Sequence, residues 1–133
     1  MKTEMQLKAR TAILRFIASE FPALDPDWWE HRVLPYIERW HHERAWRMGP
    51  RYLDQMDLAA ALRVLWRNWQ DIADWYGLPD RYRGVLGHLH MGRNHQEHPT
   101  QHSCDESNSY DQKAVDLLVG LLGNLRRDND AVA

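Results

Sequence analysis

The residues from His88 to Cys104, HLHMGRNHQEHPTQHSC, hold the densest group of chemically versatile side chains in the chain. Five of the eight histidines and the single cysteine fall within this stretch. Neutral imidazole and thiolate are ligands that zinc prefers. The same stretch places Arg93 and Asn94 shortly before His98, a combination that suits acid–base chemistry on a phosphate ester. One segment therefore has two competing chemical interpretations.

A metal site is only weakly supported by the spacing of these ligands. His95 and His98 are one helical turn apart, but Pro99 interrupts the helix before His102. His102 and Cys104 are two residues apart, which is workable only in a loop. There is no cysteine pair, and HQEH has neither the order nor the gap of the HExxH zinc motif. A solvated polar stretch with unrelated histidines is the simpler alternative, and we expect no metal and no cofactor.

The pairing of an arginine with a histidine is not informative by itself. Fourteen Arg and eight His in 133 residues give about one Arg-x4-His match by chance, and Arg83 with His88 is a second instance. A requirement for Asn directly after Arg lowers the chance expectation to roughly a few per cent. The specific feature is therefore Arg93-Asn94 followed by His98, at the expected C-terminal end of a helix.

These three side chains fit the cleavage of RNA, which carries its own nucleophile in the 2′-OH. His98 can act as base or acid because an imidazole titrates near neutral pH. Arg93 stays charged and can stabilise the phosphorane. Asn94 lies on the same helical face as His98 and can orient the imidazole or the substrate. Arg93 lies about 140° from His98 around an ideal helix, so one copy of the chain makes a poor complete site.

The elements that must position these residues are helices, because apolar residues recur with helical period and strand signals are almost absent. The pattern predicts an all-α antiparallel bundle of four main helices with a short N-terminal helix. Asp25 is a candidate N-cap, and Asp54 or Asp57 opens the third helix. The expected helices cover Met5–Phe21 within residues 1–21, Asp25 to Met48 with a kink or division at Pro35, Leu58–Tyr76, Asp80 to Pro99, and Tyr110–Arg126.

The expected core follows from the same periodicity. Leu58–Tyr76 is predicted to be one unbroken helix with a continuous apolar stripe. Most of the seven Trp are expected in the core, with Trp40 on the same helix as Trp29. Gly84 and Gly87 interrupt a helical pattern, and their spacing would allow close helix packing, including across a dimer interface. The residues predicted to face inward elsewhere are Ile13, Leu14, Ile17, Val33, Ile37, Tyr82, Val85, Leu86, Leu89, Val115, Leu118, Leu121, Leu122 and Leu125.

Composition restricts the classes of protein that fit. The length suits one domain over residues 1–133, with a polar loop at Thr100–Asn108 and a frayed tail at 128–133. A net charge of −2 means that any RNA contact must come from a local basic patch. A single Cys excludes a disulfide framework within the chain. With no signal peptide or membrane span, we expect a cytoplasmic location and no membrane partner.

A resemblance to a known family adds to this chemistry. Arg93-Asn94-x-x-x-His98 is similar to the Arg-polar-x(3–5)-His signature of HEPN domains, which are all-α and commonly ribonucleases. The stretch MDLAAALRVL from Met56, followed by Asn68-Trp69, resembles a helix of the HEPN branch that is named after a eukaryotic mRNA-surveillance endonuclease and is widespread in bacterial defence systems. The resemblance runs from about Leu53 to Leu122.

The resemblance implies a metal-independent endoribonuclease that forms a 2′,3′-cyclic phosphate. It implies a homodimer whose two motifs share one cleft, and a cognate antitoxin or defence-system protein as a possible partner. Catalysis would fall to Arg93, Asn94 and His98. His95 and Thr100 beside them are assigned to substrate binding, with plain solvent exposure as the alternative for His95.

This sequence departs from the family pattern at two positions. Glu97 stands where the branch has a small residue, and a carboxylate there could raise the pKa of His98 or repel RNA. Thr100 stands where some HEPN toxins have a Tyr that is adenylylated, so regulation by adenylylation is not expected.

In the alternative interpretation, Arg93 forms a surface ion pair with Glu97, and His98 is favoured at this position by the helix dipole. The domain would then be a non-catalytic interaction or RNA-binding module.

Overall fold

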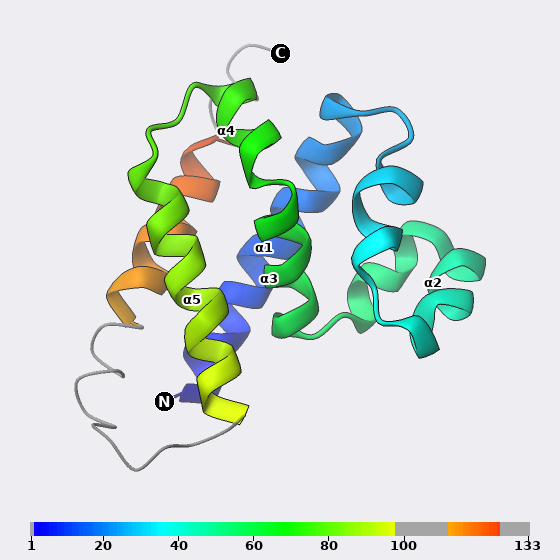
Figure 1. Cartoon of the computed structure of the whole chain (residues 1–133), viewed down its shortest axis with the longest axis horizontal. Coiled ribbons are helices and arrows are strands. Elements are labelled where there is room, and N and C mark those ends of the chain that lie inside the picture. The colour runs from blue at the N-terminus through cyan, green and yellow to red at the C-terminus, as the bar shows by residue number, and fades with distance from the viewer. Residues whose placement is uncertain (1, 98–111, 126–133) are drawn as a thin grey trace.

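The computed structural model describes residues 2–97 and 112–125, and all regular elements in these two ranges are helical (Figure 1). The all-α prediction is therefore confirmed for the described residues. A further helix covers residues 112–125. The elements in the first range are α1 (Lys2–Leu24), the π-helix η1 (Trp29–Val33), the 3-10 helices η2 (Leu34–Tyr36) and η3 (Arg39–His41), α2 (His42–Met48), the 3-10 helix η4 (Gly49–Gln55), α3 (Leu58–Arg67), α4 (Trp69–Tyr76) and α5 (Arg81–Glu97).

The core lies between α1, α3, α5 and the helix over residues 112–125, and α1 and α5 both contact α3. The prediction of a short N-terminal helix is therefore wrong, because α1 is a long helix of the core that continues through Pro22 to Leu24. The buried face of α1 presents Ile13, Phe16 and Ile17 at helical spacing, all with no exposed surface. An exposed ion pair between Lys8 Nζ and Asp116 Oδ1, 3.4 Å apart, links α1 to the last helix. The largest fully buried side chains are Phe16, Phe21, Ile13, Ile17, Leu65, Ile72, Leu86, Leu118, Leu122, Val33 and Val64.

The second predicted helix is divided, as Pro35 indicated. Asp25 begins the segment with a turn in which its Oδ1 accepts a hydrogen bond from the Asp27 backbone N–H at 2.9 Å. The chain is extended at Ile37, with φ −85° and ψ 141°, before helical structure resumes in η3. Proline lacks the N–H that a continuous helix needs. This part of the chain is therefore a series of short helices that ends in α2 and η4.

The predicted helix Leu58–Tyr76 is not continuous, and this prediction is wrong at Asn68. The helix breaks there into α3 and α4, with Asn68 at φ −99° and ψ 2°. The Asn68 Nδ2 donates to the carbonyl oxygens of Arg32 and Val64, each at 2.8 Å. The apolar stripe survives the break, because Leu65 and Trp69 on either side of it are both buried. A buried amide that binds a distant backbone carbonyl thus divides a helix whose apolar pattern is uninterrupted.

The tryptophans divide between core and surface, so the expectation of Trp in the core is wrong for three of them. The break at Ile37 removes the helical register that would have placed Trp40 beside Trp29. The other two exposed indoles lie on faces of short helices. Trp29 and Trp69 are buried, Trp28 and Trp66 are partly buried, and the exposed ones are Trp40 (77%), Trp46 (61%) and Trp75 (57%).

The last helix agrees with its prediction over residues 112–125, where Leu118 and Leu122 are buried and Leu121 is partly buried. In α5, Leu86 and Leu89 are buried as expected.

Among the described residues, no helix combines the length and apolarity needed to cross a membrane.

Candidate functional site

The predicted catalytic motif lies at the described end of α5. The backbone of Arg93, Asn94 and His95 is helical, in agreement with the prediction that the helix runs into the motif. His98 and Thr100 lie outside the described residues, as do Pro99, the polar loop and the tail. The structure thus places two of the three motif residues, Arg93 and Asn94, on a defined helix. The meeting of Arg93, Asn94 and His98 stays a prediction.

Contacts further back along α5 fix the position of this helix. Gly87 lies against the indole of Trp66 on α3, and a Cβ at position 87 would be 3.1 Å from two ring carbons. One turn earlier, the guanidinium of Arg83 lies 5.5 Å from the centroid of the Trp66 ring. Gly84 meets nothing within 4 Å. The expected close packing is therefore confirmed for Gly87, within one chain and against a neighbouring helix.

The helix α3, against which α5 packs, is itself well anchored. Its N-terminus is capped by Asp57, whose Oδ1 accepts from the Ala60 backbone N–H at 2.8 Å. This hydrogen bond identifies Asp57, and not Asp54, as the N-cap of α3.

The motif helix α5 starts after Gly77. The left-handed backbone of Gly77 (φ 67°, ψ 41°) ends α4 and places the Leu78 N–H 2.9 Å from the Ala73 carbonyl.

A second region, rich in exposed cationic and aromatic side chains, was not predicted from the sequence. Residues 39–51 form η3, α2 and the start of η4, away from α5 in Figure 1. Four Arg, two His and two Trp among these thirteen residues are all exposed. With one Glu, the segment has a net charge of +3, whereas the whole chain has −2. The clustering of Arg and Trp in RWHHERAWRMGPR was the signal that could have identified it.

A hollow of about 370 Å³ opens beside this segment. Three indoles contribute to its lining, and Trp28 and Trp29 lie edge to face with ring centroids 5.7 Å apart. Trp29 is fixed by a hydrogen bond from its Nε1 to the Ala45 carbonyl at 3.2 Å. The lining consists of Pro26, Asp27, Trp28, Trp29, Glu30, Trp46, Gly49 and Pro50.

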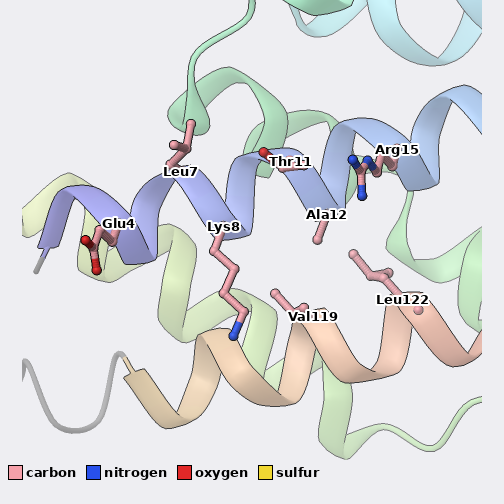
Figure 2. Close-up of a pocket in the computed structure, with 9 residues that line it drawn as sticks. Glu4, Leu7, Lys8, Thr11, Ala12, Arg15, Val119 and Leu122 are labelled. Carbon is pink, nitrogen blue, oxygen red and sulfur yellow. The ribbon is translucent and has the colours of Figure 1, made fainter.

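A groove of about 480 Å³ runs between α1 and the helix over residues 112–125. Figure 2 shows Lys8 and Ala12 of α1 facing Val119 and Leu122 of the last helix. Arg15 also lines this groove, but Glu4 and the Lys8–Asp116 pair leave no consistent charge in it. A smaller polar cleft of about 130 Å³ contains His41, Arg44 and Tyr52 together with Glu38 and Asp57. The mixed charges that line these two hollows do not indicate one class of ligand.

One cluster in the described part of the chain has metal-ligating atoms close together, namely Asp25, Asp27 and His31. Arg32 already occupies it, with Nε 3.2 Å from Asp25 Oδ2, and His31 Nδ1 lies 3.6 Å from the same oxygen. The backbone hydrogen bond from Asp27, followed by the charge of Arg32, holds the pKa of Asp25 below its ordinary value. The Asp25 carboxylate is thus compensated by protein groups, which argues against a metal there.

Comparisons with known proteins place the chain in no family. No family model matches the sequence, and no curated protein or solved structure matches the chain significantly. The functional argument therefore rests on the residues of this chain.

Proposed function

We propose that this chain is a metal-independent endoribonuclease of the HEPN type. The observation that carries the proposal is the sequence Arg93-Asn94-x-x-x-His98 in an all-α chain, together with the likeness of the α3 helix and Asn68-Trp69 to one HEPN branch. The structure supports it at one point. The Arg93-Asn94 half of the motif is on a helix that packs directly against α3.

The proposed reaction is transesterification within RNA. The 2′-oxygen attacks the adjacent phosphorus, the bond from phosphorus to the 5′-oxygen breaks, and a 2′,3′-cyclic phosphate and a 5′-OH result. His98 accepts the 2′-OH proton, and the imidazolium that results donates this proton to the departing 5′-oxygen. Arg93 stabilises the negative charge of the phosphorane, and Asn94 orients the imidazole or the substrate.

Arg93 lies about 140° from His98 around an ideal helix, so a complete site requires two copies of the chain. We propose a homodimer in which the C-terminal ends of both α5 helices meet, with α1, α3, α5 and residues 112–125 as the four-helix HEPN arrangement. His95 and Thr100 would lie beside the substrate strand. Toxin–antitoxin or anti-phage systems in the cytoplasm are the setting that the family likeness suggests, with a cognate antitoxin as partner.

The test is cleavage of RNA in EDTA by the wild type and by Arg93→Ala and His98→Ala. Both substitutions should reduce cleavage by at least roughly 100-fold, the usual contribution of a positioned acid or base for His98 and of a charge-stabilising donor for Arg93. His102→Ala and Arg67→Ala are the matched controls, since they remove the same residue types outside the motif. Cleavage that survives in both motif variants would refute the assignment of the site, and loss of wild-type activity in EDTA would point to a metal.

The second candidate is a non-catalytic RNA-binding or interaction module. The exposed arginines and indoles of residues 39–51 favour it, because such a surface can bind RNA without cleaving it. Overexpression separates the two functions. Toxicity that His98→Ala relieves supports the nuclease, whereas absent toxicity and absent cleavage with retained RNA binding support the module.

A further inference from the structure

Residues 39–51 present cations and aromatic rings on one continuous stretch of folded chain. The two exposed indoles are Trp40 and Trp46. Arg47 is paired with Glu43 at 3.4 Å, but both side chains are largely exposed, at 74% and 88%. A pair this exposed contributes little free energy, so the guanidinium is available to another anion. The exposed arginines of the segment are Arg39, Arg44, Arg47 and Arg51.

The backbone of residues 39–51 is anchored to the core through α2. Ala45 in the middle of α2 is fully buried, and its carbonyl accepts the Trp29 indole N–H. The helix ends at Gly49, whose φ of 67° favours glycine. The charged and aromatic side chains of α2 therefore project from a fixed backbone, which lowers the entropic cost of binding.

The charge of this segment selects a polyanion as its partner. Its net charge is +3, so the rest of the chain, which has −2 in total, is left with −5. Arginine planes bind phosphate through two parallel N–H groups and also stack on bases. A basic surface interleaved with aromatic rings is how proteins bind unpaired nucleic-acid strands.

The hollow beside Trp46 suits a nucleobase. Indoles and two prolines form most of its lining, and its volume of about 370 Å³ exceeds that of a single base. The charged side chains in the lining are the carboxylates of Asp27 and Glu30, which only accept hydrogen bonds. Guanine offers two adjacent N–H donors on its Watson–Crick edge, and the other bases present an acceptor beside their donor.

A membrane surface is the competing partner, and the exposed residues disfavour it. Helices that lie in a bilayer interface need a wide apolar face. Around Trp40 and Trp46 the exposed positions are occupied by Arg, His and Glu, whereas the apolar Ala45 faces the core.

We infer that residues 39–51 and the adjoining hollow bind an unpaired RNA strand. The arginines bind its phosphates, Trp40 and Trp46 stack on its bases, and the hollow takes a guanine. This inference rests on the proposed function and specifies its substrate as unpaired RNA. It also places a binding surface on the opposite side of α3 from α5 (Figure 1).

The test is fluorescence anisotropy with the full chain and a dye-labelled 2′-O-methyl RNA of about 12 nucleotides that contains guanines. This probe lacks the 2′-OH, so binding is measured whether or not the chain cleaves RNA. Trp46→Ala and Trp40→Ala should each weaken binding roughly 5- to 150-fold, while Trp46→Phe should retain most of it. Trp75→Ala is the matched control, because Trp75 is similarly exposed on α4.

Salt dependence and base identity supply two independent readouts. Arg44→Ala and Arg47→Ala should each reduce the slope of log K against log salt by about 0.7, and Arg67→Ala should leave it unchanged. Asp27→Asn with Glu30→Gln should weaken binding of the guanine-containing strand while leaving or strengthening binding of oligouridine. A duplex of the same sequence should bind more weakly than the single strand.

The outcomes separate this inference from the nuclease proposal. Equal affinities for Trp46→Ala and Trp75→Ala would overturn the inference even if His98-dependent cleavage is found. Binding to phosphatidylcholine–phosphatidylserine vesicles without binding to RNA would also overturn it, in favour of a membrane contact. Trp46-dependent binding in a chain that cleaves nothing would uphold the surface and refute only the proposed function.

Discussion

Gly87 of α5 lies against the indole of Trp66 of α3 so closely that a Cβ at position 87 would be 3.1 Å from both Cη2 and Cζ3 of the ring. Three residues away in the same helix, Gly84 has nothing within 4 Å of its Cβ position. Two glycines in similar sequence surroundings thus differ in what an added methyl group would meet. The chain provides a matched pair of variants for measuring how tightly the motif helix is held.

Gly84→Ala should raise the free energy of unfolding by up to about 1 kcal/mol, the helix propensity of Ala over Gly. Gly87→Ala gains the same propensity but must displace the Trp66 ring, at a cost of about 1–3 kcal/mol. We expect Gly87→Ala to be less stable than Gly84→Ala by about 1–3 kcal/mol in urea unfolding. Equal stabilisation by the two substitutions would show that the Gly87 contact is loose.

Asn68 links two parts of the fold that are distant in sequence. It is 3% exposed and its amide donates to the carbonyls of Arg32 and Val64. Asn68→Ala removes both side-chain hydrogen bonds; the Val64 carbonyl still accepts the Asn68 backbone N–H at 3.2 Å, whereas the Arg32 carbonyl loses the Asn68 side-chain donor. We expect a loss of about 1–3 kcal/mol from these hydrogen bonds. Gln70→Ala on the exposed face of α4 is the control and should stay within about 0.5 kcal/mol of the wild type. A similar small effect at both positions would contradict the structural role of Asn68.

The turn at Asp25 should make the free energy of unfolding depend on pH. The Asp27 backbone N–H, followed by the charges of Arg32 and His31, lowers the pKa of Asp25 from 3.8. A carboxylate whose pKa is lower in the folded chain stabilises the fold above its unfolded pKa, and this contribution is lost as the pH falls through the folded pKa. The stability difference between wild type and Asp25→Asn should therefore be larger at neutral pH than below about pH 3. Asp27→Asn, whose side chain has no such role in the turn, should show no comparable pH dependence.

Local signals predicted two helix boundaries, the start of α3 and the end of α4, because the causes of both lie within a few residues. The cap at Asp57 acts on the amide three residues on, and the left-handed turn at Gly77 needs only its own backbone freedom. The division at Asn68 was not predictable, since one of its partners is the carbonyl of Arg32, 36 residues away in sequence. The exposure of Trp40 likewise depends on the extended backbone at Ile37.

The two candidate sites differ in how much the sequence revealed. Arg93 and Asn94 could be placed on a helix from periodicity alone, and the structure confirms their helical backbone. Their meeting with His98 depends on residues beyond the described part of the chain. The surface formed by residues 39–51 could be recognised only with tertiary information. Their composition was visible in the sequence, but the burial of Ala45, which turns the arginines and indoles outward, is a tertiary property.

A mixing experiment tests whether the proposed nuclease site is shared between two chains. Arg93→Ala and His98→Ala chains are each inactive under the proposal. After subunit exchange, about half of the molecules in an equal mixture are heterodimers. Each heterodimer brings one intact Arg93 and one intact His98 into the same cleft. Cleavage by the mixture should therefore exceed that of either variant alone, up to about half of the wild-type rate.

A site built within one chain cannot recover in this experiment, because every chain lacks one of the two residues. The control is a mixture of Arg93→Ala with an Arg93→Ala/His98→Ala chain, in which no cleft regains an arginine. Cross-linking of differently tagged chains verifies that heterodimers have formed. If heterodimers form and the mixture cleaves no faster than its parents, the shared cleft is refuted, and with it the reason for requiring a dimer.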